Sequence, residues 1–563
     1  MEKRVFLAIL ISFGILAVYQ AYFAPPPPAP PAPSAVSAPS TPPVPAASNS
    51  VAPASPVQSA APTPGAAPAV PDTAARDILV DTDTVSAVFT TRGGVLKSWK
   101  LKRYHGEDGK PLELIPQNLP ETFERPFALA VDDANVSAVL RSAVYQTSTE
   151  SLTLGAGSGT LEFVYNDGTT TVARKRLQFQ PDGKAYFVSV DASVTVGGKP
   201  QPVIVHWGPA VGRGYPDAGQ QEFPTRAIQL TDSVARIAAS DLEAQKRYET
   251  VVRFAGVEDQ YFLSAVLPAE ARQGQAVRID YQPFALPVMN DPQNRTRALI
   301  AYSVRTPGPA SVGFFVGPKE LNIVRAVNPE LTDAIDFGMF RFLVVPLLQA
   351  LNGINRYLGN YGWSIVALTV FINLLIFPFR HKSMVSMRKM QAIQPEVKAI
   401  QERYAKYKIT DPERQKMNQE MMALYKQRGV NPASGCVPML ATMPVLFAFY
   451  AMLSASIELR GAPFFGWLTD LSVQDPYYIT PVLMGGTMFW QQKMMPSTAD
   501  PLQQKMFLLM PIIFTAMFLA APSGLVVYWL VSNLLAIGQQ YITNRMIGAP
   551  PPRPLATIES KKR

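Results

Sequence analysis

Residue types that usually carry catalysis or bind metal ions are scarce and scattered in this chain. Its single cysteine is Cys436, and its three histidines, His105, His206 and His381, lie far apart in the sequence. The sequence contains no G-x-x-x-x-G-K-[ST] phosphate loop, no G-x-S-x-G elbow and no H-E-x-x-H pair. We therefore expect a protein that is not an enzyme and that needs neither a cofactor nor a metal ion.

The polar residues that stand out lie inside long apolar runs. Thr369 and Asn373 are four residues apart and would share one helix face. Thr442 lies in the next run, and Tyr528, Ser532 and Asn533 lie in the last. Polar side chains at membrane depth face a protein interior or a water-filled cavity. The alternative is hydrogen bonding between helices, which contributes about 0.6 kcal/mol for each bond.

Six apolar runs predict six membrane-spanning helices, since a bilayer core needs about 20 helical residues. The first, from Val5 to about Phe23, follows Lys3 and Arg4 without a convincing cleavage site, so we expect an uncleaved anchor over residues 1–23. The other five runs are Trp363–Phe379, Cys436–Ala455, Tyr477–Gln492, Met506–Ala521 and Leu525–Thr543.

The distribution of charge predicts the orientation of these helices. Residues 380–435 carry 12 Lys/Arg against five Asp/Glu, and residues 542–563 carry five against one. Residues 72–335 instead carry 27 basic and 30 acidic residues. By the positive-inside rule, both termini are cytoplasmic and residues 24–335 are exported. Topology then accounts for the net charge of +9, and no direct contact with nucleic acid is required.

The exported part divides into three pieces. Residues 24–71 are rich in proline and alanine and predict an extended spacer. Residues 72–330 contain short β-type runs separated by turn residues, which favours an all-β sandwich. Residues 331–360 have a broad apolar face and predict an amphipathic helix at the membrane interface, broken near Pro346. Packing of that helix against the sandwich is the alternative.

The cytoplasmic segment 380–432 predicts a helical hairpin. Its first stripe includes Met384, Met387 and Met390, and Asp411-Pro412 has the form of a helix start. The stripes either pack against each other or present an adaptable methionine surface to hydrophobic partners. A basic tail over residues 546–563 follows the last helix.

Several short motifs resemble those of the YidC family of membrane protein insertases, the bacterial branch of the Oxa and Albino proteins. They include Gly435-Cys-Val-Pro438, Glu458-Leu-Arg460, Asp475-Pro-Tyr-Tyr478 and Pro522-Ser-Gly-Leu525. The anchor, the proline-rich linker and the exported β domain resemble the Gram-negative form, so the resemblance spans the chain.

The resemblance implies a polytopic α-helical inner-membrane protein. Its core of five transmembrane helices spans residues 361–545, and its periplasmic domain is a β-supersandwich. It implies a hydrophilic groove, open to the cytoplasm and lipid, that inserts nascent membrane proteins alone or with the Sec translocon and without nucleotide hydrolysis. The ribosome or targeting machinery would bind the basic hairpin and tail.

Residue roles also follow from the resemblance. The resemblance implies that Met443, Leu446, Met517 and Trp529 contact the client and that Thr369 lies at the groove. From the residues themselves we expect Asn373, Thr442, Tyr528 and Ser532 to be the other polar groove residues, and Met384, Met387 and Met390 to be client contacts on the hairpin. At Asn373 the family typically carries an arginine, and no Lys or Arg lies between Arg356 and Arg380.

Two other functions remain open at this point. A solute transporter would favour intramembrane charge pairs or an internal repeat of helices, and the sequence has neither. A membrane-anchored periplasmic carbohydrate-binding protein would need polar residues that converge on the sandwich, where His206 beside Trp207 is a candidate. Neither alternative explains the basic hairpin.

Overall fold

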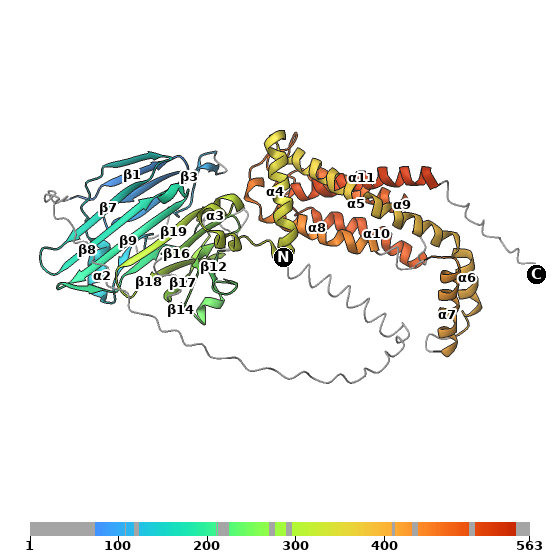
Figure 1. Cartoon of the computed structure of the whole chain (residues 1–563), viewed down its shortest axis with the longest axis horizontal. Helices are drawn as coiled ribbons and strands as arrows, with labels where there is room; N and C mark the ends of the chain where they lie inside the picture. The colour runs from blue at the N-terminus through green and yellow to red at the C-terminus, as the bar shows by residue number, and fades with distance from the viewer. Residues whose placement is uncertain are drawn as a thin grey trace, which may run out of the picture.

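The computed structural model describes residues 74–547 except 107–108, 118–122, 210, 212–224, 270–275, 289–294, 408–410, 431–436 and 495–500. Side chains of residues 437–442, 501–507 and 547 are also not described. The predicted anchor over residues 1–23, the linker over 24–71 and nearly all of the tail over 546–563 lie outside the described residues. Within them, a β domain is followed by a helical core (Figure 1).

The strands of the β domain form three sheets in the described part of the chain. The first sheet has the order β4-β3-β2-β1-β6, and the second has the order β13-β12-β15-β16-β19-β9-β8-β7, with β10 paired to β9. The first comprises β1 (Asp77–Thr82), β2 (Val85–Thr90), β3 (Val95–His105), β4 (Pro111–Glu113) and β6 (Ser151–Gly155). The second comprises β7 (Gly159–Asn166), β8 (Thr171–Phe179), β9 (Phe187–Val196), β10 (Lys199–Gln201), β12 (Arg226–Leu230), β13 (Val234–Ile237), β15 (Phe254–Glu258), β16 (Phe262–Pro268) and β19 (Ala310–Pro318).

The third sheet has the order β14-β17-β18-β11-β5. It comprises β5 (Leu129–Ala130), β11 (Ile204–Trp207), β14 (Arg247–Thr250), β17 (Val277–Pro287) and β18 (Thr296–Arg305). Two short helices, α2 (Ala134–Ser142) and α3 (Leu321–Val327), accompany the sheets. The predicted β-rich domain is therefore confirmed, and α3 leads out of it toward the helical core.

One charged side chain lies within the aromatic core of the β domain. Lys175 on β8 is fully buried, and its ammonium donates to the carbonyl oxygens of Phe127, at 2.7 Å, and Gly93, at 3.3 Å. It also lies over the rings of Tyr145 and Phe163. Burial lowers the pKa of Lys175 to about 7. The carbonyl oxygens and ring faces compensate for the lost hydration of the ammonium.

The helical core contains the five predicted apolar runs, each as a helix. The helices are α4 (Arg341–Leu358), α5 (Tyr361–Ala392), α6 (Gln394–Arg403), α7 (Pro412–Gln427), α8 (Val437–Ala455), α9 (Ile479–Met494), α10 (Pro501–Phe518) and α11 (Ser523–Ile547). By length and composition, Tyr361–Ala392 and Ser523–Met546 could each cross a membrane, and Met443–Ala455 and Leu508–Phe518 are shorter apolar segments. Helix α5 packs against α4 and α11, and α9 packs against α10 and α11.

The predicted break at Pro346 is wrong. Helix α4 runs without interruption from Arg341 to Leu358, with Pro346 inside its second turn. At this position proline removes one backbone hydrogen bond, which would otherwise run from residue 346 to Phe342 O, and the packing of α4 offsets that loss. Buried Val344, Leu348 and Leu351 pack into the helical core, and α4 lies across the end of that core beside the β domain (Figure 1).

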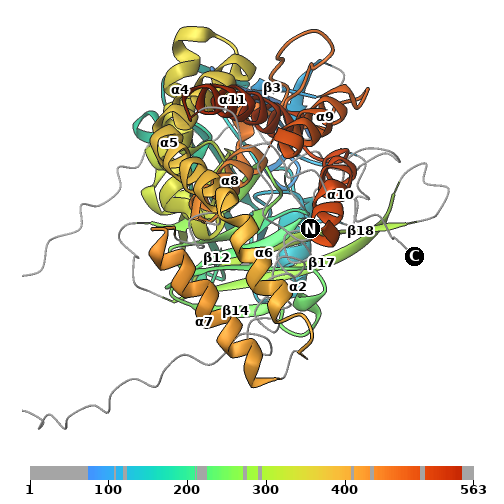
Figure 2. The same ribbon diagram turned by 90° about the vertical axis from the view of Figure 1, so that its right-hand side faces the viewer.

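The hairpin also differs in its first half from the prediction. Helix α5 continues without interruption past Phe379 as far as Ala392, so Met384, Met387 and Met390 extend the apolar helix. The predicted start at Asp411 is confirmed, because its carboxylate accepts a hydrogen bond from Glu413 N at 3.0 Å. Helices α6 and α7 project from the end of the core that is far from the β domain (Figures 1 and 2).

Close packing of α9 and α10 depends on a glycine, which gives a first prediction. A Cβ atom at Gly485 would lie 2.0 Å from Thr515 Oγ1, whose hydroxyl donates to Pro511 O at 2.7 Å. We expect Gly485→Ala to lower the free energy of unfolding by about 1–3 kcal/mol, because Thr515 must move and lose its bond. Chemical unfolding of the purified protein in detergent measures this.

Gly486→Ala is the matched control, because a Cβ atom at that position would have no neighbour within 4 Å. Both substitutions improve helix propensity equally. Equal stability of the two variants would contradict the packing role of Gly485.

Candidate functional site

A line of hydrogen bonds follows one face of α5. The hydroxyl of Thr369, which is fully buried, donates to Ile365 O at 2.6 Å, and Asn373 Nδ2 donates to Thr369 O at 2.8 Å. Arg380 then donates from Nη1 to Asn373 Oδ1 at 3.0 Å, across seven residues of the same helix. The guanidinium therefore points back along α5, away from the charged hairpin and into the apolar span.

Tyr528 on α11 faces this line from the neighbouring helix. Tyr528 is buried and stacks on Phe449 of α8, with ring centroids 4.1 Å apart, and it lies within electrostatic range of Arg380. One turn further along α11, the buried Ser532 hydroxyl makes no hydrogen bond of good geometry. The side chain of Thr442 is outside the described residues. The structure thus brings Asn373, Arg380 and Tyr528 together from two helices.

The apolar candidates occupy two different environments. Met443 and Leu446 on α8 are half-buried, and Trp529 on α11 packs on the rings of Phe514 and Phe518 of α10. Met517, also on α10, is 50% exposed. In the hairpin, Met384 and Met387 are half-buried, while Met390 packs on a small cluster formed by Ile393, Val397 and Val430. Packing of the hairpin stripes therefore includes Met390, and a client-contacting role for Met384 and Met387 stays a prediction.

A second set of polar contacts, which the sequence did not predict, ties α5 to α11 beyond Phe377. Gln539 Nε2 donates to Phe377 O at 3.2 Å, and His381 Nδ1 lies 3.2 Å from the Thr543 hydroxyl. Arg388, seven residues beyond His381 on α5, donates to Asn544. The regular spacing of polar residues on α11 is the signal in the sequence that could have revealed this face.

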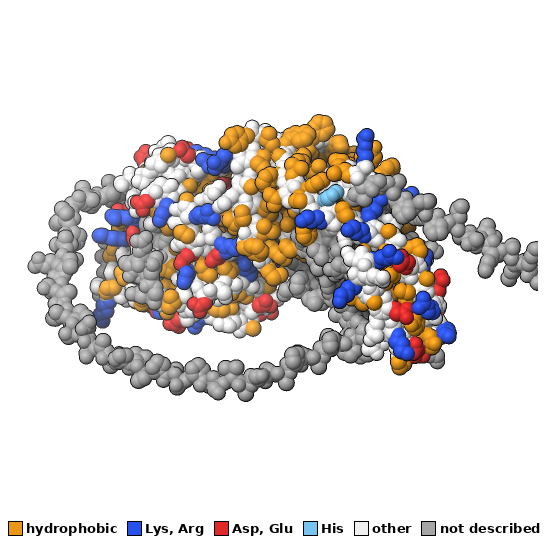
Figure 3. All heavy atoms as spheres, turned by 45° about the vertical axis from the view of Figure 1, so that its right-hand side comes forward, with side chains coloured by type: hydrophobic (Ala, Val, Ile, Leu, Met, Phe, Trp, Pro, Cys, Tyr) orange, Lys and Arg blue, Asp and Glu red, His pale blue; other side chains and the backbone are white. Residues whose placement is uncertain are grey.

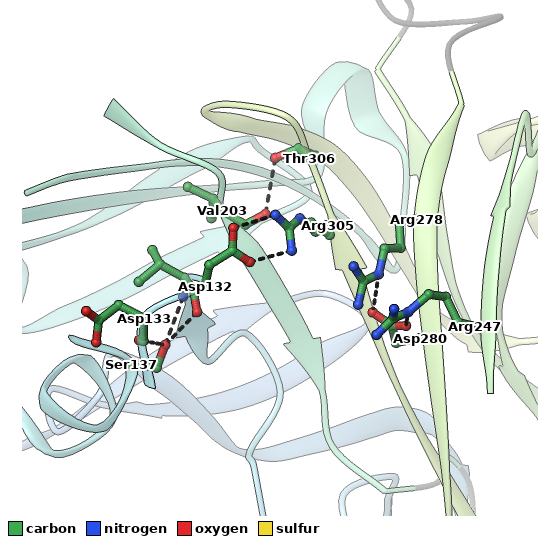
Figure 4. Close-up of polar contacts among 10 residues, drawn as sticks. Asp132, Asp133, Ser137, Val203, Arg247, Arg278, Asp280, Arg305 and Thr306 are labelled. Atoms are coloured by element: carbon green, nitrogen blue, oxygen red, sulfur yellow. Dashed lines mark hydrogen bonds and ion pairs between the residues drawn. The ribbon is translucent and has the colours of Figure 1, made fainter. Parts of the chain in front are cut away.

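The polar groups of the third sheet form ion pairs with one another. Figure 4 shows Asp280 between Arg247 and Arg278, each at 2.9 Å, and Asp132 opposite Arg305. Nearby, burial lowers the pKa of His206 to about 4, with Arg141 contributing, so the ring is neutral at physiological pH. These carboxylates lie in ion pairs and do not form a convergent acid–base pair.

The surface separates into apolar and charged regions. In Figure 3, hydrophobic side chains gather over the helical core, and charged side chains lie mostly on the β domain on one side and the hairpin on the other. Exposed aromatic and aliphatic residues of the core include Phe371, Leu374, Leu375, Leu483, Trp490, Ile512 and Ile513. An apolar surface of this extent is typical of a membrane protein.

Comparisons with known proteins agree with this division. Residues 77–350 match the family described as YidC periplasmic domain, and residues 353–549 match the family described as 60Kd inner membrane protein. A membrane protein insertase YidC of Geotalea daltonii is 35% identical over 98% of this chain and 100% of its own length. This chain belongs to the YidC family.

Other YidC relatives are similarly close. The Geobacter sulfurreducens insertase is 37% identical over 83% of this chain and 86% of its own length. A solved structure described as an active YidC insertase with its first transmembrane domain resolved is 18% identical, covers 82% of this chain and 91% of that chain, and has a TM-score of 0.34.

The protein is therefore a membrane protein insertase of the inner membrane. Its substrates are nascent membrane proteins, which it transfers into lipid. Its β-rich part corresponds to the family's periplasmic domain, and its helical part follows at the C-terminal side. The resemblance drawn from the short sequence motifs is thus confirmed.

The Asp475-Pro-Tyr-Tyr motif of this YidC chain anchors the start of α9. The Asp475 carboxylate accepts from Thr480 N at 2.7 Å, Thr480 Oγ1 at 2.8 Å, Tyr477 N at 2.9 Å and Trp467 Nε1 at 3.0 Å. Burial alone would raise the pKa of Asp475, but the hydrogen bonds, led by that from Thr480 N, outweigh burial and lower it.

Asp475→Ala should lower the free energy of unfolding by about 2 kcal/mol, because the start of α9 loses its cap and charged acceptor. Since its pKa is lowered by folding, Asp475 stabilises the protein above pH about 4, and this contribution is lost as the pH falls further. Unfolding in detergent at pH 3.5 and 7 measures both effects. Gln474→Ala, at an exposed neighbour, is the control; an equal loss in it would contradict the role of Asp475.

Proposed function

We propose that this insertase receives the polar part of its client in a hydrated groove beside α5 and α11, built on Asn373 and Arg380. The observation that carries the proposal is the hydrogen bond from Arg380 Nη1 to Asn373 Oδ1 at 3.0 Å. Thr369 acts at the buried base of this groove, where its carbonyl oxygen orients Asn373. Tyr528, Ser532 and Thr442 complete the polar lining.

The direction of the Arg380 side chain supports hydration of this groove. Arginine near the end of a transmembrane helix ordinarily extends toward the nearest water, because a charge in hydrocarbon costs about 2.5–3.5 kcal/mol or more. Arg380 instead extends toward the middle of the apolar span, in the direction that helical side chains lean. Such a position is stable only where water or an anionic group accompanies the guanidinium.

Arg380 is proposed to supply the cation that family members carry at the position of Asn373. In this chain Asn373 is the amide that holds the guanidinium in place. Among the described residues Arg380 makes no ion pair, so its charge is available to an acidic group on a client's exported tail. The groove therefore keeps an electrostatic attraction for such tails although position 373 is neutral.

The apolar part of the client is proposed to contact Met443, Leu446, Met517 and Trp529 until lipid accepts it. Met517 is well placed for this role because half of its side chain is exposed. Met384, Met387 and Met390 make earlier contacts on the cytoplasmic side. Burial of the client's apolar segment in lipid supplies the free energy, so the step needs no nucleotide.

The proposed topology has six crossings, with both termini in the cytoplasm and residues 24–335 in the periplasm as a β-supersandwich on its linker. The basic balance of residues 380–435 supports this orientation. Helix α4 is proposed to lie in the outer interface, where Phe342, 75% exposed, and Tyr357, 92% exposed, would meet lipid. The hairpin and tail would receive ribosomes or targeting factors, and the Sec translocon would bind the core.

Removal of the groove cation tests its role. Arg380→Gln should slow insertion of a client with a short acidic exported tail about tenfold, the equivalent of one charged hydrogen bond. Insertion into vesicles reconstituted with the full-length protein measures the rate. Lys382→Gln removes the same charge from an exposed neighbouring position and should leave the rate within about twofold. Equal effects of the two substitutions would contradict the proposal.

Water accessibility tests the groove directly. In a Cys436→Ser background, a cysteine introduced by Asn373→Cys should react with a membrane-impermeant maleimide, because the groove is wet. Phe371→Cys is the control: this residue is 60% exposed on the helix but should face lipid and stay unreactive. If Asn373→Cys is as unreactive as Phe371→Cys, the groove is dry and the proposed mechanism fails.

A further inference from the structure

The β domain and the helical core are joined through a small number of polar contacts. Gln260, in the turn before β16, donates to Ser454 O of α8 at 2.7 Å. Arg460 lies over the ring of Phe262, 5.6 Å from its centroid, and donates to His105 O at 3.4 Å. The segment between α8 and α9 therefore forms the core's side of this junction.

Glu458 lies inside this junction, in the short helix η7 (Ile457–Leu459). Its Oε1 accepts from Asn352 Nδ2 of α4 at 3.4 Å, and Asn352 Oδ1 in turn accepts from the Tyr361 hydroxyl at 3.2 Å. The junction thus brings together η7, α4 and the start of α5 around one carboxylate.

A second carboxylate approaches from the β domain. Glu320, directly before α3, accepts from the Tyr104 hydroxyl of β3 at 3.0 Å, and the Tyr104 ring packs edge-on against Phe262. The titratable group that makes ionisation of Glu458 harder is Glu320. The hydroxyls of Tyr104 and Tyr361 also lie within electrostatic range of Glu458, but they are uncharged in the range where a carboxyl titrates. Arg460, the nearest cation in sequence, is directed at Phe262 and His105.

This environment favours the protonated form of Glu458. Burial raises the pKa of its carboxyl, Glu320 raises it further, and together they bring it to about 7. Burial and the neighbouring carboxylates also raise the pKa of Tyr104, so this hydroxyl remains a donor to Glu320 throughout the physiological range. A neutral amide, Asn352, is the hydrogen-bond partner of Glu458 among the described residues.

We propose that Glu458 and Glu320 form a proton-controlled latch that docks the β domain on the helical core. With Glu458 protonated, one negative charge is present in the junction and the domain is docked. With Glu458 ionised, two carboxylates face each other in a poorly hydrated contact, and the domain separates. The latch acts on the extracytoplasmic side and is independent of the proposed groove.

The pH range follows from the direction of the shift. Because docking raises the pKa of Glu458 above its ordinary value of about 4.3, docking takes up a proton. Docking is strongest below pH about 4.3 and weakens as the pH rises from there toward 7. Above pH about 7 it stays at the weaker level. The docking equilibrium should change by up to about two orders of magnitude across this range.

The distance between the domain and the core tests the latch in the full-length protein. In a Cys436→Ser background, spin labels at Lys199→Cys on β10 and Tyr477→Cys in the core report this distance in lipid nanodiscs. Both positions are exposed. We expect a narrow distance distribution at pH 5 that broadens by pH 8.

Two variants separate the latch from a general effect of pH. Glu458→Gln keeps the bond to Asn352 without titrating, so its distribution should stay narrow at both pH values. Glu320→Gln lowers the repulsion and should retain a smaller response. Broadening of Glu458→Gln to the same extent as the parent, or a parent distribution unchanged between pH 5 and 8, would overturn the proposal. If Glu458→Gln does not fold, an undiminished response in Glu320→Gln overturns it equally.

Discussion

The hydrogen bond between Arg380 and Asn373 is the contact on which the helical core is organised. It ends a line of polar bonds that begins at Ile365 O and passes through Thr369 and Asn373. That line extends over 15 residues, or roughly 22 Å of helix at 1.5 Å per residue. Lipid hydrocarbon offers no hydrogen-bond partner to the polar groups on this face of α5. The neighbouring helices must therefore supply polar partners or leave access for water.

The rest of the core is arranged around that requirement. Toward the hairpin, Gln539 and Thr543 of α11 bond directly to α5. Toward the β domain, close apolar packing lies beside polar bonds. Tyr528 stacks on Phe449 and Gly362 lies against the ring of Phe464, while Asn352 bonds to both Glu458 and Tyr361. The direct polar bonds between α5 and α11 beyond Phe377 are therefore found at the hairpin end of the core.

Much of this arrangement could be predicted from the sequence, because it depends on local patterns. Apolar runs located helices α5, α8, α9, α10 and α11, short β-type runs between turn residues located the β domain, and Asp411-Pro412 located the start of α7. Features that depend on tertiary contacts could not be predicted. The sequence places Arg380 at the end of an apolar run, and only the fold shows that its guanidinium turns back to Asn373. Likewise, Pro346 is tolerated inside α4 because buried Leu348 and Leu351 pack the helix beyond it against the core, which the sequence alone does not show.

The partner of each buried charge decides what that charge can do. Buried Glu258 lies between two cations, Arg236 at 2.8 Å and buried Lys319 at 3.1 Å, so its charge is compensated within the fold. Arg380 and Glu458 instead have neutral amides, Asn373 and Asn352, as their hydrogen-bond partners in the described part of the chain. An amide fixes the position of a charge without cancelling its field. Each of these charges therefore remains responsive to something from outside the fold: an anionic group for the guanidinium, and a proton for the carboxylate.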